Sequence, residues 1–291
     1  MTVPPTLVQY HGALAKTGCN GERADMEQQE TLTPEQIERY ARQILLAGVG
    51  QKGQKKLLES SVLCVGTGGL GSAVLNYLAV AGVGRLGIID GDKVELSNIH
   101  RQVIYTTEDL GRPKVEVARD RIRALNPEVT VETHPGRLTA ANALEIIPKY
   151  DAVVDACDNF PTRFLSNDAC FFTKRPLFFG SVLRFEGQAT VFFPGRPEEP
   201  CYRCLFPEPP PAGFVPSTAE VGILGAVAGL IGTIQATECM KYLLSIGNGL
   251  NRRLLLYDGL TMMFRPIEVR KNRRCRLCGD EPTITTLSEY K

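Results

Sequence analysis

Short apolar runs alternate with amphipathic stretches along most of this chain. Strands are expected at residues 62–65, 85–90, 129–134, 152–155 and 176–180, most of which are apolar runs. Between them, helical spacing of apolar residues occupies 70–81, 114–125, 140–147 and 163–173. Strands that alternate with helices favour a parallel sheet covered by helices on both faces. The pattern therefore predicts an α/β fold, doubly wound around a mostly parallel sheet.

The pattern changes after Gly180. Residues 188–193 are typical of an extended, antiparallel strand, and two closing strands are expected at 254–257 and 265–268. Residues 207–216 contain five prolines, which excludes a helix or a central strand and predicts an exposed, mobile crossover. Residues 221–244 return to helical spacing. We therefore expect antiparallel strands to continue the mostly parallel sheet.

The two ends of the chain differ from its middle. Residues 1–30 are polar with scattered glycines and predict a flexible tail. Thr33 followed by Pro34 has the composition of a helix start, which predicts a helix at 34–46 with Tyr40 in the core. No linker follows, so we expect a single domain over 31–280 and a C-terminal tail at 281–291.

Composition excludes several classes of function. Hydrophobic residues make up 43% and charged residues 22% of the chain, which allows a buried core. The formal net charge of +1 provides no broad positive field, so neither nucleic acid nor an anionic membrane is an expected partner. The most apolar stretch, residues 221–234, is shorter than the roughly 20 residues of a membrane span. Residues 1–30 show no secretory signal.

A glycine-rich turn follows the first expected strand and opens the next helix. Residues 66–71 read GTGGLG, which fits the G-x-G-x-x-G pattern of Rossmann-like domains. Glycines let the backbone approach a phosphate, and the helix N-terminus supplies N–H donors. Asp90 ends the second strand, 19 residues beyond Gly71, where a carboxylate accepts hydrogen bonds from ribose hydroxyls. This motif alone predicts a nucleotide with ribose and phosphates, and favours NAD or FAD over ATP.

Four further motifs change that interpretation. They read RYARQ at residues 39–43, SNIHRQ at 97–102, GRPK at 111–114 and DACDN at 155–159. Together with the glycine turn, and in this order, they resemble the MoeB/ThiF family of molybdopterin-synthase and sulfur-carrier protein adenylyltransferases, relatives of the ubiquitin-activating enzymes. The resemblance extends from about residue 32 to 279. It implies ATP as the nucleotide and Mg²⁺ bound beside it.

The resemblance also implies roles for individual residues. Arg101 and Lys114 match phosphate-binding cations, Asp158 the Mg²⁺ ligand and Asp90 the ribose acceptor. Arg42 matches an arginine that reaches the γ-phosphate from the partner subunit, which implies a homodimer. Such cations suit the chemistry, because a carboxylate that attacks the α-phosphate of ATP is repelled by its negative charge. The implied nucleotide-binding set also includes Gly66, Gly68, Gly69, Gly71, Asp92, Ser97, Asn98 and Asn159.

Several of these residues have a structural alternative. Lys114 has the position of a surface lysine at a helix start, and Asp158 with Asn159 that of a helix cap. Arg42 fits a solvated arginine on an amphipathic helix, and Asp92 fits a turn. The sequence leaves these alternatives open.

Four of the nine cysteines form two Cys-x-x-Cys pairs, separated by 70 residues. Two such pairs complete a closed tetrahedral site, the usual geometry of structural zinc, and the family resemblance implies the same. A redox-active pair is the alternative. The odd count and this spacing favour a reducing compartment, so we expect a cytoplasmic protein. The expected zinc ligands are Cys201, Cys204, Cys275 and Cys278, whereas Cys64, Cys157, Cys170 and Cys239 are expected in the core.

The chain departs from its relatives at two points. Thr218 stands where many of them carry a cysteine that forms a thioester or persulfide, and a threonine hydroxyl is a much poorer nucleophile than a thiolate. We therefore expect no covalent thioester there. The chain ends at Lys291 without the rhodanese domain of some relatives. Sulfur is therefore expected from a separate donor protein.

These observations predict ATP-dependent adenylylation of the C-terminal glycine carboxylate of a ubiquitin-like sulfur-carrier protein, in the biosynthesis of molybdopterin, thiamine or thiolated tRNA. An NAD-dependent oxidoreductase remains an alternative that rests on the glycine turn and Asp90 alone. A non-catalytic scaffold that resembles an activating enzyme is a third hypothesis. A relative that modifies tRNA threonylcarbamoyladenosine by the same adenylation chemistry is disfavoured by the cysteine pairs and the near-neutral charge.

Overall fold

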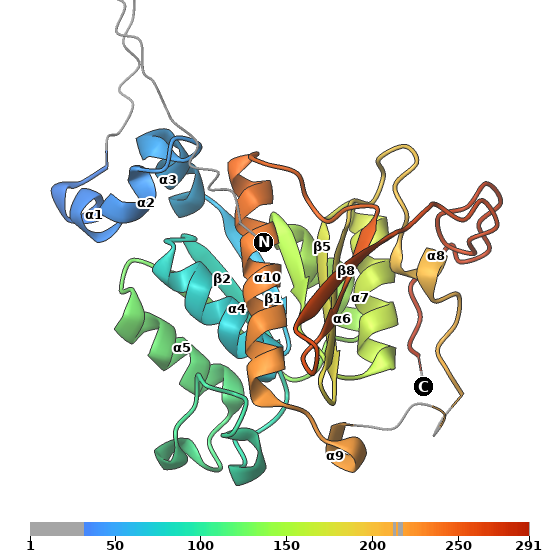
Figure 1. The fold of residues 1–291 in the computed structure, drawn as a ribbon, viewed down its shortest axis with the longest axis horizontal. Helices are drawn as coiled ribbons and strands as arrows, with labels where there is room; N and C mark the ends of the chain where they lie inside the picture. Colours follow the sequence, from blue (N-terminus) through green and yellow to red (C-terminus); the bar gives the residue numbers. More distant parts are fainter. Residues whose placement is uncertain (1–31, 212–213, 215–217, 291) are drawn as a thin grey trace, which may run out of the picture.

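A computed structural model describes residues 32–211, 214 and 218–290. Within them, one sheet of eight strands has the order β3-β2-β1-β4-β5-β6-β7-β8 (Figure 1). The first five strands pair in parallel. β6, β7 and β8 continue the sheet in antiparallel pairs. The strands are β1 (Ser61–Val65), β2 (Arg85–Asp90), β3 (Thr130–Pro135), β4 (Ala152–Asp155), β5 (Leu177–Leu183), β6 (Glu186–Phe192), β7 (Arg253–Asp258) and β8 (Met263–Glu268).

Helices cover both faces of this sheet, as the alternating pattern predicts. Along β1, Val62 and Cys64 pack into one core with α4 (Gly69–Val80), α5 (Lys114–Leu125) and α10 (Gly225–Leu244). Leu63 and Val65 point to the other face, where α6 (Ala140–Ile146) and α7 (Phe160–Thr173) complete a second core. Successive strand residues face opposite sides, so a strand buried on both faces reads as a continuous apolar run.

Two expected helices are broken in the structure. The helix expected at 34–46 is divided at Tyr40 into α1 (Pro34–Arg39) and α2 (Ala41–Ile44). Tyr40 is buried in the core as expected, and Asn126 donates a 2.8 Å hydrogen bond to its hydroxyl. The helix expected from residue 221 begins at Gly225, after a short α9 (Thr218–Val221) and Gly222, whose φ is +79°.

Some elements were not predicted from the pattern. Helix α3 (Gly50–Leu58) buries only Gln54 and Leu57, and its sequence contains too few apolar residues to stand out. A short α8 lies inside the first cysteine pair, and three single-turn helices connect larger elements. These are α8 (Tyr202–Leu205), η1 (Leu96–Asn98), η2 (Thr107–Asp109) and η3 (Ile147–Lys149).

Helix α10 packs across the first core against α4 and the sheet. Gly232 permits this approach, since a Cβ at that position would lie 2.5 Å from the backbone oxygen of Leu70. The amide of Gln235 donates to the backbone oxygens of Asp155 and Phe178, at 2.7 and 2.9 Å. The apolar stretch at 221–234 is therefore largely part of a packed core helix. No helix in the described part of the chain is long and apolar enough to cross a membrane.

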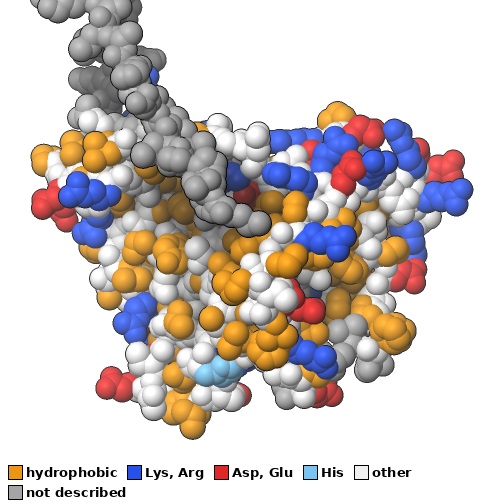
Figure 2. All heavy atoms as spheres, viewed as in Figure 1, with side chains coloured by type: hydrophobic (Ala, Val, Ile, Leu, Met, Phe, Trp, Pro, Cys, Tyr) orange, Lys and Arg blue, Asp and Glu red, His pale blue; other side chains and the backbone are white. Residues whose placement is uncertain are grey.

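The two tails expected at the ends of the chain differ in how far the structure describes them. The expected tail at 1–30 lies outside the described residues, as does part of the proline-rich crossover. Residues 281–290 are described, and Leu287 and Tyr290 pack against the core on the α6 and α7 side. The face shown in Figure 2 carries basic and acidic side chains together near the loop that holds the second cysteine pair. Arg273, for example, pairs there with Glu198 and Asp280.

Candidate nucleotide site and cysteine cluster

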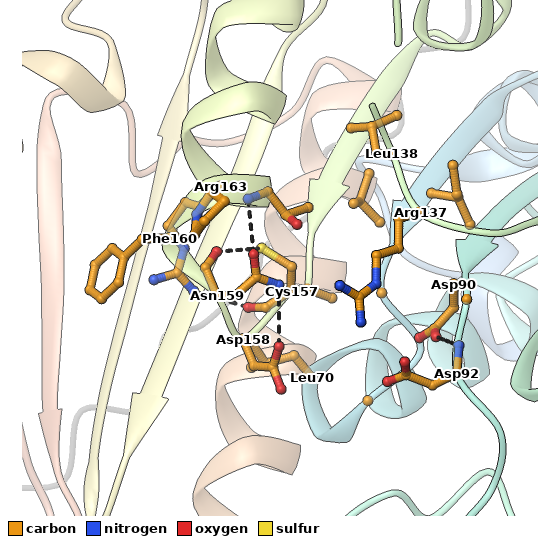
Figure 3. A pocket seen from close by; sticks show the side chains of 18 of the residues that line it. Leu70, Asp90, Asp92, Arg137, Leu138, Cys157, Asp158, Asn159, Phe160 and Arg163 are labelled. Carbon is orange, nitrogen blue, oxygen red and sulfur yellow. Dashed lines mark hydrogen bonds between the residues drawn. The ribbon is translucent and has the colours of Figure 1, made fainter. Parts of the chain in front are cut away.

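A cavity of about 750 Å³ opens at the carboxyl ends of the parallel strands. It lies where the strand order reverses between β1 and β4, the usual position of ligands in open α/β sheets. Five segments bring predicted residues to it: the glycine turn after β1, the segment after β2, the motif at 97–102, the start of α5 and the turn after β4. Figure 3 shows Asp90 and Asp92 on one side of the cavity and Asp158 and Asn159 on the other. The lining includes Gly66, Gly68, Gly69, Asp90, Asp92, Arg101, Lys114, Asp158 and Asn159.

The glycine turn joins β1 to α4 with very little space. Gly66 has φ +92°, and a Cβ there would lie 2.8 Å from the backbone oxygen of Ala156. A Cβ at Gly71 would lie 2.2 Å from the backbone oxygen of Gly66. Gly71 does not line the cavity, so its visible role is close packing of the helix on the turn. The first turn of α4 can then present its N–H groups to the cavity.

Asp90 is held by the glycine turn. Its Oδ2 accepts hydrogen bonds from the backbone N–H and the hydroxyl of Thr67, both at 2.8 Å. Its Oδ1 accepts one from the backbone N–H of Asp92, also at 2.8 Å. These three donors fix the carboxylate at the edge of the cavity, where it can still accept from a ribose. Thr67, which fills a variable position of the motif, was not predicted to take part.

Lys114 and Asp92 form an ion pair in the cavity wall. The Nζ of Lys114 lies 3.1 Å from Oδ2 of Asp92, and the lysine is 6% exposed. Its backbone N–H also donates to the backbone oxygen of Asp92 at 3.0 Å. Lys114 is therefore not a surface lysine. Its ammonium lies at the cavity with a carboxylate beside it.

Arg101 lines the cavity from the SNIHRQ motif together with Gln102, whereas Ser97 and Asn98 do not. Its Nη1 donates to the backbone oxygen of Ser97 at 2.9 Å. Asn98 is buried, and its Oδ1 accepts from the backbone N–H of Glu95 at 3.1 Å, which closes the single-turn helix η1. Contacts of Ser97 and Asn98 with a nucleotide stay a prediction. Arg42 lies on α2 and does not line the cavity of its own chain.

The turn after β4 places Asp158 and Asn159 in different environments, which decides which of them caps the next helix. The Oδ1 of Asn159 accepts a 2.9 Å hydrogen bond from the backbone N–H of Thr162, so Asn159 is the N-cap of α7. The carboxylate of Asp158 is exposed at the cavity (Figure 3). The cap therefore belongs to Asn159, and Asp158 keeps an accessible carboxylate of the type that binds Mg²⁺.

A buried ion pair lies beneath this turn. The Nε of Arg163 lies 3.5 Å from Oδ2 of Asp155, and Nη2 donates to the backbone oxygen of Cys157 at 3.0 Å. Burial raises the pKa of the Asp155 carboxyl, and the Arg163 guanidinium opposes that shift. This pair was not predicted, because Asp155 belongs to a strand and Arg163 to a helix in any reading of the sequence.

Other cavity residues were also not predicted. Arg137 and Leu138 come from the loop between β3 and α6. Gln102 belongs to the SNIHRQ motif but was given no role; it is buried, and its Oε1 has no partner among the described residues. Glu289 and Tyr290 reach the cavity wall from the C-terminal segment. Only the position of the loop, directly after a parallel strand, could have indicated Arg137.

The four predicted zinc ligands come together. The Sγ atoms of Cys201, Cys204, Cys275 and Cys278 all lie within 4.8 Å of one another. Cys201 and Cys275 are 3.6 Å apart at sulfur, and Cys204 and Cys278 are 3.4 Å apart. All four are free thiols, and such a cluster fits Zn²⁺ with its bonds of about 2.3 Å to sulfur. The other described cysteines, Cys64, Cys157, Cys170 and Cys239, are buried in the core as predicted.

The cysteine cluster is bonded to the wall of the cavity. Arg203, between the first two cysteines, forms two bonds to the buried Asp168 of α7, at 2.8 and 2.9 Å. The hydroxyl of Tyr290 donates to the same carboxylate. The Arg203 guanidinium also lies 4.7 Å from the ring centre of Phe164 and 5.0 Å from that of Tyr290. One buried ion pair thus connects the cluster, α7 and the C-terminal segment.

Comparisons with known proteins agree with this geometry. The model of the ThiF family matches residues 40–277. The sulfur carrier protein adenylyltransferase of Thermus thermophilus is 54% identical, with 89% of this chain and 97% of that protein covered. The SAMP-activating enzyme E1 of Haloferax volcanii is 48% identical, with 86% and 92% covered.

Two further comparisons define the limits of the likeness. The adenylyltransferase and sulfurtransferase MOCS3 of Culex quinquefasciatus is 48% identical over 89% of this chain, which spans 59% of that longer protein. The crystal structure of E. coli MccB with ATP superposes with a TM-score of 0.71 at 22% identity, covering 83% of this chain and 74% of that one. The structural likeness shows the fold, and the family model with the close relatives shows the family: the chain belongs to the ThiF family.

Proposed function

We propose that this chain is an adenylyltransferase that uses ATP to activate the C-terminal carboxylate of a ubiquitin-like sulfur-carrier protein. One observation carries the proposal. Asp90, Arg101, Lys114 and Asp158 come from four separate segments and line the same cavity beside the glycine turn. The relative from Thermus thermophilus, 54% identical and matched over nearly its full length, is named for this activity.

The site supports a direct displacement. Asp90 holds the ribose, and the glycine turn with the N-terminus of α4 receives the phosphates. A carboxylate oxygen of the carrier attacks the α-phosphorus, a new oxygen–phosphorus bond forms, and the bond from the α-phosphorus to the bridging oxygen breaks. Pyrophosphate leaves with that bonding pair, and the carrier keeps the adenylate as a mixed anhydride. Arg101 and Lys114 stabilise the negative charge that develops on the leaving group. The step needs no nucleophile from the enzyme.

Two metal ions belong to the proposal. Asp158 would hold Mg²⁺, which neutralises phosphate charge when it is bound. The four cysteines would hold Zn²⁺ with every ligand position filled by sulfur. That ion would have no position for a water, so its role would be structural. We also infer a cytoplasmic location, because thiols are kept reduced there.

Partners complete the proposal. Arg42 does not reach its own cavity, so its proposed contact with the γ-phosphate requires a second copy of the chain. Sulfur would come from a separate donor protein. Thr218 begins α9, and its hydroxyl is too weak a nucleophile for the thioester chemistry of related cysteines.

Family membership and the charges of the site count against the alternatives. A dinucleotide needs few cations, because a helix terminus suffices for its pyrophosphate. An oxidoreductase would leave the convergence of Arg101, Lys114 and Asp158 without a role. A non-catalytic scaffold would have no use for an accessible Asp158 beside the phosphate-binding turn.

Exchange of pyrophosphate into ATP tests the function. Purified protein with Mg²⁺ and a carrier that ends in Gly-Gly should catalyse exchange, and Asp158→Ala should abolish it with zinc content unchanged. Asp120→Ala, on the exposed side of α5, is the matched control and should exchange as wild type does. Full activity of Asp158→Ala would remove that residue from catalysis. A preference for NADH over Mg·ATP in binding would favour an oxidoreductase instead.

A further inference from the structure

Arg137 is a cation at the cavity that no motif indicates. It lies on the loop between β3 and α6, next to the buried Leu138. Figure 3 shows its side chain extending from that loop toward the space between Asp90 and Asp158. A Cβ at Gly91 would lie 3.4 Å from Cγ of Arg137, so the stem of the arginine passes beside the residue that follows Asp90.

The charge of Arg137 is not balanced by the protein. Lys114 pairs with Asp92 at 3.1 Å, and Arg163 with Asp155 at 3.5 Å. In contrast, no carboxylate of the described residues lies within 4.0 Å of the Arg137 guanidinium. Among the cations that line the cavity, Arg101 and Arg137 are thus the two without a carboxylate partner. An arginine in a cavity without an anion suits an anionic ligand.

The order of the strands indicates which anion Arg137 meets. The sheet runs β3-β2-β1-β4, so the groups along its edge are Arg137, Asp90, the glycine turn and Asp158. A nucleotide with its ribose at Asp90 and its phosphates over the turn has the α-phosphate between these two. A cation that enters from the β3 side and passes Asp90 therefore meets the α-phosphate before the others.

We propose that Arg137 binds the α-phosphate, both in ATP and in the adenylate that remains after pyrophosphate leaves. This inference rests on the proposed function. The role of Arg137 differs from that of Arg101 and Lys114, which act on the leaving pyrophosphate. The contact of Arg137 with the α-phosphate persists through the reaction and retains the mixed anhydride in the cavity. The competing role is a guanidinium stacked on the face of the base.

A ligand series separates these roles without any need for turnover. Wild type, Arg137→Met and Arg137→Lys are titrated with ATP and AMP by calorimetry, and with adenosine by ligand-observed NMR. Arg137→Met should weaken AMP and ATP by about tenfold to a hundredfold, as expected for a lost hydrogen bond to a charged group. Adenosine should change by less than about twofold, and Arg137→Lys should recover part of the AMP affinity because it restores the charge.

The control is Arg123→Met, on the exposed last turn of α5 and outside the cavity lining, which should bind all three ligands as wild type does. An equal loss for adenosine and AMP would overturn the phosphate contact in favour of stacking on the base. Unchanged AMP affinity in Arg137→Met would overturn any binding role. A wild type that binds AMP but exchanges with no Gly-Gly carrier would count only against the proposed function, whereas one that binds none of the three ligands would overturn both.

Discussion

The buried pair of Asp155 and Arg163 sets the shape of the turn that carries Asp158. Both residues are almost inaccessible, at 0% and 6% exposure. Arg163 bonds to the backbone oxygen of Cys157, one residue before Asp158, and so anchors the turn from below. A buried ion pair adds little net stability, but removal of one partner leaves an uncompensated charge.

Replacement of Arg163 by methionine should lower the free energy of unfolding at pH 7.5 by about 3–5 kcal/mol. Without the guanidinium, burial raises the pKa of Asp155 further in the folded state, opposed only by the hydrogen bonds from Cys157. When the folded-state pKa of a carboxyl lies above its unfolded-state pKa, the carboxyl stabilises the fold at pH values below the unfolded-state pKa. That contribution is lost as pH rises through the folded-state pKa. The deficit against wild type should therefore shrink at pH 5, as measured by urea denaturation.

The double variant Asp155→Asn with Arg163→Met removes both charges and is the matched control. It should regain much of the stability and show little dependence of the deficit on pH. A single variant with the same deficit at both pH values would contradict a charge-based cause.

Single residues also show which parts of the site a sequence can predict. Gly66 and Gly71 were predictable because close backbone packing demands glycine at fixed places after a strand, although only Gly66 lines the cavity. Asp90 was predictable because a carboxylate ends the neighbouring parallel strand. Lys114 and Asp158 were indicated by the family motifs, but their burial and exposure were not. Arg137 and Tyr290 belong to no motif, because their presence at the cavity depends on how distant segments pack.

Helix α7 shows how one element carries both structure and function. Asn159 caps its N-terminus, Pro161 lies in its first turn, and Lys174 ends it in the left-handed conformation with φ +56°. The cap satisfies the N–H of Thr162 and fixes where the helix begins. Asp158 precedes this start directly, so the cap also fixes the position of that carboxylate.

Loss of the cap should cost about 1 kcal/mol of unfolding free energy in Asn159→Ala, whereas Asn159→Asp should retain the stability because aspartate caps equally well. Urea denaturation measures both. Titration with Mg·ATP then tests the predicted nucleotide contact of Asn159: equal affinities of wild type and the aspartate variant would assign the residue to capping alone. Stability of the alanine variant equal to wild type would contradict the cap.

The elements themselves were predictable to different degrees. Strands β1, β2, β4 and β5 are largely buried, so their apolar residues stand out in the sequence. The expected limits of the five parallel strands differ from the observed ones by a few residues at most. Helix α3 was missed because two glycines and three lysines hide its two buried positions. The breaks at Tyr40 and Gly222 follow from backbone angles that spacing of apolar residues does not encode.

Across the whole molecule, the cysteine cluster joins segments that are far apart in the sequence. Cys204 and Cys275 are separated by 70 residues, which include α10 and the last two strands. The segment that follows the second pair is held there, because the backbone N–H groups of Thr283 and Ile284 donate to the backbone oxygen of Arg276 at 2.9 and 2.8 Å. From there the chain reaches the cavity wall at Tyr290.

Removal of zinc by a chelator, or by Cys204→Ser, should lower the free energy of unfolding by about 4 kcal/mol, in analogy with a covalent link that closes a loop of this length. For a domain of this size the thermal midpoint should fall by roughly 8–16 °C. Hydrogen exchange of residues 283–290 should become faster, since their anchor on the cluster is lost. Calorimetry and mass-detected exchange measure the two effects.

Cys170→Ala is the control for this experiment, because Cys170 is a core cysteine that should leave zinc binding and the chelator response intact. A metal-free protein with an unchanged thermal midpoint would contradict a structural role. Faster exchange confined to the cysteine loops, with residues 283–290 unaffected, would contradict the proposed connection to the C-terminal segment.

The bidentate bond between Arg203 and Asp168 has a wider consequence. It ties the thiol cluster to the helix that begins beside Asp158, so damage at the sulfurs reaches the nucleotide without touching any residue that binds it. Loss of the proposed zinc, or oxidation of the thiols, would then slow the proposed adenylylation. The enzyme would report the state of the metal pool through its own output.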